Sequence, residues 1–213
     1  MEFSEVLASR HSVRFFEDRP LSEETLRGIV LDAQRAPSTV NAQEWRVWIA
    51  TGSPLEAIRA EYASLNARKA AASADLQCAP GCGWSEAARS RQKAFSASRT
   101  AAGLDAVKLE SQSQLFHAPA VAYLTIPKPV NPWAVLDLGG FEMAMLLAAA
   151  SRGIGSIPAY NLVKHPEPVK KALGIPDSEA LVIGVALGYE KDCPLNRFRS
   201  GRAPLDDFLK ICR

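Results

Sequence analysis

The sequence predicts a mixed α and β fold in which helices cover a central sheet. Segments with strand and helix patterns interleave along the chain, and this order packs helices against a sheet. Two of the strand segments are apolar at nearly every position, as expected of strands buried on both faces. The chain has 213 residues, of which 47% are hydrophobic, so it can bury one large core in one domain.

Strands are expected at residues 45–50, 121–126 and 181–187. Helices are expected at residues 3–9, after Ser22, and at residues 134–152 and 166–173. Ser22 is an N-cap residue before an acidic first turn, and Pro37 ends the helix that follows it. Gly153 and Gly174 end the last two helices.

Composition excludes several classes of protein. The net charge of +2 is too small to favour binding to nucleic acid or to an anionic membrane. The N-terminus carries Glu2 and Glu5 and has no apolar run, so we expect no signal peptide and a cytoplasmic location. Residues 134–150 are strongly apolar, but Asp137 and Glu142 interrupt them, which favours a buried helix over a membrane span.

The four cysteines do not predict a metal site. Cys78 and Cys82 are separated by three residues and have no histidine nearby, whereas a zinc site needs more ligands at tighter spacing. We therefore expect no bound metal and expect reduced thiols, which also include Cys193 and Cys212.

The segment Arg10–Arg14 is a candidate anion site, because it holds three basic side chains and a hydroxyl within five residues. About two dozen residues later, Ala36–Gln43 offers short polar side chains suited to hydrogen-bonding a flat heterocycle: Ser38, Thr39, Asn41 and Gln43. Together the two segments indicate a mononucleotide cofactor. Taken singly, each is also typical of a solvated helix end or a capped turn.

Residues 66–110 differ from the rest of the chain, since they are rich in Ala, Ser, Arg and Lys. Within them, residues 87–98 have the pattern of a helix with a mostly polar surface. Two interpretations remain open, a mobile insertion or a lid over an active site. In the second, Trp84 and Phe95 are the aromatic side chains that reach a substrate; in the first, they only pack.

No other catalytic pattern is visible, neither a serine hydrolase triad nor a phosphate loop nor a dinucleotide fingerprint. The Gly153-Ile154-Gly155 run is too short for that fingerprint and follows a helix. His117 and His165 are isolated, so we expect them in the core or on the surface. This pattern suits an enzyme in which a bound cofactor carries the chemistry.

An ordered set of motifs closely resembles the FMN-dependent nitroreductase family. The motifs begin with the segments 10–14 and 36–45 and continue with 133–139, 153–158, 173–176, 186–189 and 202–206. The resemblance covers residues 3–60 and 115–210. It implies an α+β fold with a central mixed or antiparallel sheet flanked by helices, one domain over 1–213, and an intertwined homodimer. It also implies that residues 66–110 form a variable lid and that residues 193–213 form an arm around the partner subunit.

The resemblance assigns the FMN site residue by residue. It implies that Arg10, His11, Ser12 and Arg14 bind the phosphate and ribityl chain. Arg202 and, as a weaker candidate, Arg199 complete the phosphate site. It implies that the flavin ring is contacted by Pro37, Ser38, Thr39 and Asn41 from the other subunit. Near N5 it is contacted by Pro158, Ala159, Tyr160 and Asn161, and Gln112 or Ser111 also lies near the ring. The substrate falls to Tyr160, Trp84 and Phe95. Two departures stand out: His11 replaces the usual Arg, and Tyr160-Asn161 replaces a frequent Glu-Gly pair.

The activity implied is transfer of hydride from NADH or NADPH to flavin N5, followed by reduction of a small aromatic acceptor, a nitroaromatic or quinone, in the same cleft. The kinetics are then ping-pong, and no single side chain is catalytic. The segments Pro158–Val163, His165-Pro166 and Val169–Pro176 look most like the nitroarene and nitrobenzoate reductase branch. Two alternatives remain, a flavin-dependent dehydrogenase that uses oxygen as acceptor and a non-catalytic FMN-binding dimer.

Overall fold

The computed structural model describes residues 2–77 and 83–213, and it has the predicted α+β architecture. Cys78 and Cys82 lie outside the described residues. Four strands form one antiparallel sheet in the order β1-β2-β4-β3. Their bounds are β1 Arg46–Thr51, β2 Ala120–Pro127, β3 Gly155–Ala159 and β4 Glu179–Gly188. The antiparallel form of the sheet expected from the family resemblance is therefore confirmed.

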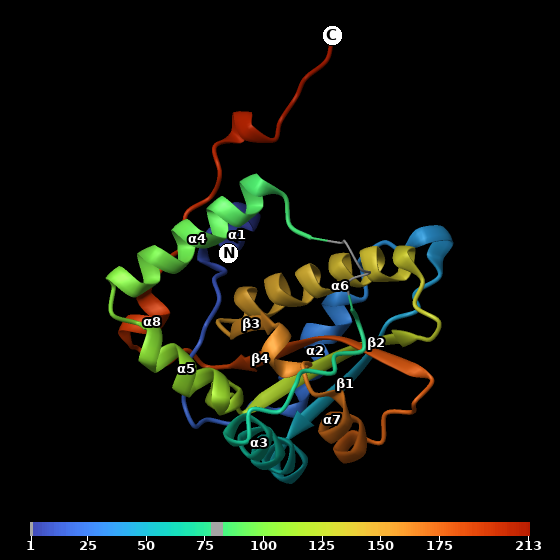
Figure 1. Cartoon of the computed structure of the whole chain (residues 1–213). Coiled ribbons are helices and arrows are strands. Elements are labelled where there is room, and N and C mark those ends of the chain that lie inside the picture. Colours follow the sequence, from blue (N-terminus) through green and yellow to red (C-terminus); the bar gives the residue numbers. More distant parts are fainter. Residues whose placement is uncertain (1, 78–82) are drawn as a thin grey trace.

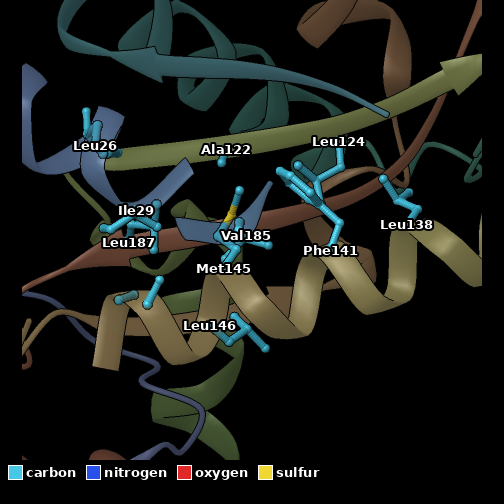
Figure 2. Close-up of a cluster of buried hydrophobic side chains, with 14 of the residues drawn as sticks. Leu26, Ile29, Ala122, Leu124, Leu138, Phe141, Met145, Leu146, Val185 and Leu187 are labelled. Carbon is cyan, nitrogen blue, oxygen red and sulfur yellow. The ribbon is translucent and has the colours of Figure 1, made fainter. Parts of the chain in front are cut away.

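Helices cover both faces of this sheet (Figure 1). One face carries α2 (Glu23–Ala33) and α6 (Pro132–Ser151), and the other carries α3 (Gly52–Ala67) and α7 (Pro166–Leu173). The central strand β2 alternates between these two layers: Ala122 and Leu124 pack with α6, whereas Val121 and Tyr123 pack with α3. Figure 2 shows Phe141 and Met145 of α6 pointing at the first of these faces. Burial on both faces explains why the sequence of β2 is apolar throughout.

The apolar helix α6 has the length and hydropathy to cross a membrane by composition alone. In the fold it packs against α2 and the sheet, and its buried residues include Leu138, Phe141 and Met145. The helix is therefore a core element here, as expected from its interruption by Asp137 and Glu142.

The remaining helices gather beyond the β3 edge of the sheet (Figure 1). They are α1 (Phe3–Ser9), α4 (Glu86–Ala101), α5 (Asp105–Ser113) and α8 (Pro194–Arg197). Four short 3₁₀ turns complete the described elements: η1 (Thr39–Asn41), η2 (Leu115–His117), η3 (Tyr160–Leu162) and η4 (Leu205–Asp207). The last residues extend away from the body of the molecule.

Four of the described helices and strands were not expected from the sequence: α3, α5, α8 and β3. Helix α3 begins with a Gly-Ser-Pro run, which is typical of a turn, and tertiary packing of Leu55, Ile58 and Tyr62 overrides that signal. Helix α5 begins within residues 66–110, where the sequence predicted a helix only at residues 87–98. The segment 153–158, expected as a loop, forms β3 from Gly155 onward because it pairs with β4. Helix α2 also ends at Ala33, a few residues before Pro37.

Candidate functional site

The basic segment Arg10–Arg14 is fixed to the sheet by its backbone. The N–H of Val13 donates to the carbonyl of Ser156 in β3 at 3.0 Å. This approach requires Gly155, because a Cβ at that position would lie 2.8 Å from Cγ2 of Val13. On the other side the N–H of Arg14 donates to Oδ1 of Asn196, whose side chain is 1% exposed, at 2.6 Å. The strand and α8 thus hold the basic segment in one position.

The basic segment and the C-terminal segment line one cavity of about 270 Å³, here called the basic cavity. Its lining contains all six residues assigned to the phosphate and ribityl chain: Arg10, His11, Ser12, Arg14, Arg199 and Arg202. No carboxylate lines it. Guanidinium groups bind phosphate oxygens in a bidentate manner, so this lining has the chemistry of an anion site.

The arginines of the basic cavity differ in how far they are already engaged. Arg202 donates to the backbone carbonyls of Ser200 and Gly201, both at 3.1 Å. Arg199 donates to the backbone carbonyl of Asn196. The Arg10 guanidinium has no hydrogen bond or ion pair with any residue that the structure describes. Arg10 is therefore the arginine most available to an incoming anion.

His11 lines the basic cavity, but both of its ring nitrogens face protein acceptors. Nδ1 lies 2.8 Å from the carbonyl oxygen of Ser9, and Nε2 lies 3.0 Å from Oε1 of Glu190. These contacts occupy both polar atoms of the ring. His11 therefore links the basic segment to Glu190, and it has fewer polar atoms available to an anion in the cavity than Arg10 has.

A second cavity of about 270 Å³ adjoins the first and shares Arg14 and Phe198 with it. It lies between the end of β3, α4, α5 and α8, and is here called the lid cavity. Its lining includes the assigned Gln112, Phe95 and the whole segment Pro158–Asn161. It also includes three residues that the sequence did not single out: Arg99, Lys108 and Phe116. Because the two cavities adjoin at Arg14 and Phe198, an elongated ligand with an anionic end that extends past these residues would contact both.

Burial and like charges together act on the cations of these cavities. Burial, followed by the nearby Arg99 and Arg199, lowers the pKa of Arg14. Burial and then Arg99 lower the pKa of Lys108. Both shifts report a positively charged region that is partly withdrawn from water. An anion bound there would relieve the mutual repulsion.

A strained turn presents Phe116 to the lid cavity. Residues 115–117 all have left-handed backbone conformations, with φ between 52° and 63°, which non-glycine residues rarely adopt. Arg59 spans this turn by donating to the carbonyls of Gln114 at 3.1 Å and Ala118 at 2.9 Å. Phe116 is 1% exposed. The surrounding contacts hold the strain, and the aromatic ring is fixed against the cavity.

Several assigned residues line neither cavity of this chain. The segment Pro37–Asn41 lies at the start of α6, where the N–H and Oγ1 of Thr39 donate to the carboxylate of Asp137 at 2.9 and 3.1 Å. Val40 in this segment is 95% exposed and has a φ of 46°. Trp84 is 69% exposed and lines neither cavity. Ser111 is buried and donates to the carbonyl of Arg14, so of the two alternatives Gln112 is the one that faces the lid cavity.

The histidines and acidic residues form no metal centre. His165 is buried and packs edge-on against Tyr62, and His117 stacks on Phe15. Among residues 2–77 and 83–213, no group of three or more His, Cys, Asp or Glu side chains is placed to hold a metal ion.

An antiparallel sheet covered by helices defines an α+β fold, and two adjoining cavities lined by cationic side chains lie beside its strand β3. The chain belongs to the nitroreductase family, whose sequence model matches residues 7–189. It is similar to 4-nitrobenzoate reductases from Pseudomonas putida (28% identity, 97% of this chain and 94% of the relative) and Nocardioides sp. strain LMS-CY (27%, 96% and 87%).

Two solved structures have the same fold. One is the FMN- and NADPH-dependent nitroreductase NfnB of Sphigopyxis sp. strain HMH, with a TM-score of 0.90 and 26% identity over the whole of both chains. The other is the FMN-dependent NfnB of Mycobacterium smegmatis in complex with NADPH, with a TM-score of 0.89, 26% identity, and 99% and 98% of the two chains covered. The family resemblance seen in the sequence motifs is confirmed.

Proposed function

We propose that this protein is an FMN-dependent reductase of nitroaromatic compounds that takes its electrons from NADPH or NADH. The observation that carries the proposal is the pair of adjoining cavities, which share Arg14 and Phe198. One end has the chemistry of a phosphate site, and the other end combines aromatic side chains with the Pro158–Asn161 segment. FMN is a flat ring joined by a flexible chain to a phosphate, so its parts match the two ends.

In this proposal Arg10, Arg14, Arg199 and Arg202 bind the FMN phosphate and ribityl chain. Ser12 donates its hydroxyl to the same group, and His11 completes the wall. The segment Pro158–Asn161 and Gln112 lie along the ring. When bound, FMN supplies the transfer of electrons from the nicotinamide to the acceptor. The role of the chain is to bind, orient and desolvate, so no side chain is assigned as the catalytic group.

We also propose that the active protein is a two-fold homodimer. The segment Pro37–Asn41 lines neither of these two cavities of its own chain, and its strained backbone is anchored by Asp137. The partner subunit's copy of this segment then completes the flavin site. Residues 193–213 form the arm around the partner subunit.

Exposed apolar side chains support this assembly. They lie on α1, α2 and α6, in η4 and in the residues after it, and include Phe3, Leu7, Leu31, Trp133, Leu136, Leu205, Phe208 and Ile211. Large apolar surface of this kind is typical of interfaces. Light scattering should therefore give twice the chain mass of 23.0 kDa. A monomeric mass at micromolar concentration with FMN still bound would contradict the dimer.

Helix α4 and the first part of α5 fall within residues 66–110 and form the lid of the second cavity in this proposal. Phe95 and Tyr160 contact the acceptor. The donor and the acceptor then use one cleft in turn, so the kinetics are ping-pong. Parallel double-reciprocal lines at several acceptor concentrations are expected, and intersecting lines would refute the shared cleft. We further propose a cytoplasmic location, which cell fractionation tests.

The purified protein tests the activity directly. A yellow protein that NADPH or NADH bleaches without oxygen, and that a nitroaromatic reoxidises, is the expected result. An oxygen-using dehydrogenase would be favoured if an organic substrate bleached the protein and oxygen, but not a nitroaromatic, restored the colour. A yellow protein that neither nicotinamide bleaches would favour a non-catalytic FMN-binding dimer.

A further inference from the structure

Lys108 is a half-buried lysine whose ammonium group has no partner among the residues that the structure describes. It lies on α5 one helical turn before Gln112, so the two side chains share a face, and both line the lid cavity. No hydrogen bond or ion pair joins its Nζ to any residue that the structure describes. A lysine that is partly withdrawn from water normally has such a partner.

The neighbouring charges leave Lys108 without a counter-ion. Arg14 and Arg99 line the same cavity, and no Asp or Glu does. Asp105 lies close by, but its carboxylate accepts from Nε of Arg99 at 2.6 Å and from Oγ1 of Thr100 at 2.7 Å. These bonds close the turn between α4 and α5, so Asp105 is engaged there. Lys108 is the cation of the lid cavity that remains for a ligand.

Apart from its cations and the amides Gln112 and Asn161, the lid cavity is lined by aromatic and apolar side chains. Phe95 and Phe198 have ring centroids 6.0 Å apart, and Phe116 and Tyr160 also line the cavity. Flat aromatic ligands pack favourably on such rings. A cavity that joins aromatic walls to an unpartnered ammonium group matches an aromatic molecule with an anionic substituent.

We propose that Lys108 binds the carboxylate of an aromatic acid that serves as electron acceptor. This inference rests on the proposed function and adds a specificity residue to it. Lys108 does not line the basic cavity, where other cations are assigned to the FMN phosphate. Arg99, fixed by Asp105, is a positioning residue that adds positive charge beside Lys108.

The test compares acceptors that differ only in charge. For the FMN-loaded protein and its Lys108→Gln variant, kcat/KM is measured with 4-nitrobenzoate and with its neutral methyl ester. The variant should lose about five- to fiftyfold on the acid, as expected for losing one partly exposed charge-assisted contact, and change little on the ester. The exposed Lys93→Gln on α4 is the matched control and should preserve both values. Equal losses on acid and ester would overturn the inference.

Two further measurements separate this inference from neighbouring ones. A loss in kcat/KM for NADPH, with the acid-to-ester ratio preserved, would assign Lys108 to the phosphates of the nicotinamide donor and overturn the carboxylate proposal. The charge-retaining Lys108→Arg should restore preference for the acid if charge is the cause.

Binding of benzoate, which carries no nitro group, is then followed by calorimetry. Weaker binding to Lys108→Gln than to the parent supports the carboxylate site even in the absence of turnover. Equal binding to both proteins overturns it. The proposed function itself fails instead if FMN-loaded protein reduces neither acceptor.

Discussion

Arg14 is the side chain whose removal best tests the cofactor site, because it lines both cavities. We predict that Arg14→Met weakens FMN binding and leaves the free protein almost as stable as before. The reasoning is electrostatic. Its guanidinium makes one hydrogen bond, to the carbonyl of Ser12 at 3.0 Å, and is repelled by Arg99 and Arg199. The unliganded protein therefore loses little when the charge is removed.

The magnitude follows from the contacts that remain. A hydrogen bond to a charged group contributes about 1.5–3 kcal/mol. Arg10 stays available in the variant, whereas Arg199 and Arg202 are exposed and bound to backbone carbonyls. A loss of about 2 kcal/mol, or roughly a thirtyfold increase in Kd, is expected for FMN. The stability of the free protein should change by less than about 1 kcal/mol.

Fluorescence titration of the stripped protein with FMN gives Kd, and thermal unfolding with and without FMN gives both stabilities. The stabilisation by saturating FMN should shrink in the variant by the same free energy as binding. Arg27→Met on the exposed face of α2 is the control and should alter neither quantity. An unchanged Kd, or a free protein destabilised as much as the complex, would refute the reasoning.

Three other predictions concern the supports of the site. Asp75→Asn should cost about 2 kcal/mol of unfolding free energy near neutral pH, because burial of the carboxylate is outweighed by its bonds to the Leu181 N–H (2.9 Å) and to Lys170 Nζ (2.7 Å). These bonds lower the pKa of Asp75, so the difference in unfolding free energy between parent and variant is present above about pH 4 and closes as the pH falls through the lowered pKa. Urea unfolding at a series of pH values measures this difference. A difference that persists at low pH would contradict the prediction. Tyr62→Phe should cost about 1–2 kcal/mol of unfolding free energy, because it removes the hydroxyl that donates to the buried carbonyl oxygen of Leu162 at 2.7 Å. An unchanged midpoint of unfolding would contradict this prediction. Gly155→Ala should cost about 1–3 kcal/mol of unfolding free energy and lower FMN affinity, because the new methyl group displaces the basic segment. Titration with FMN measures the affinity, and an unaltered Kd would contradict the need for this close approach.

Local patterns in the sequence determined most of the elements that form the core. The apolar strands β2 and β4 and the helices α1, α2, α6 and α7 follow from periodicity, capping residues and terminating glycines, all of which act over a few neighbouring residues. The basic segment 10–14 and the order of the motifs were also sufficient for the family. The sequence therefore settled the fold class.

Tertiary structure decided which residues share a cavity. Arg10 and Arg202 meet only because β3 and α8 bring the two ends of the chain together, and β3 itself is a strand only because β4 lies beside it. Lys108 and Arg99 belong to helices whose sequence looks like a solvated surface. Their placement depends on the bond between Arg99 and Asp105, which ties α4 to α5, and on the contact of Phe95 in α4 with Phe198 beside α8. Contacts between distant residues leave no period in the local sequence, so the composition of the lid cavity was visible only in the folded chain.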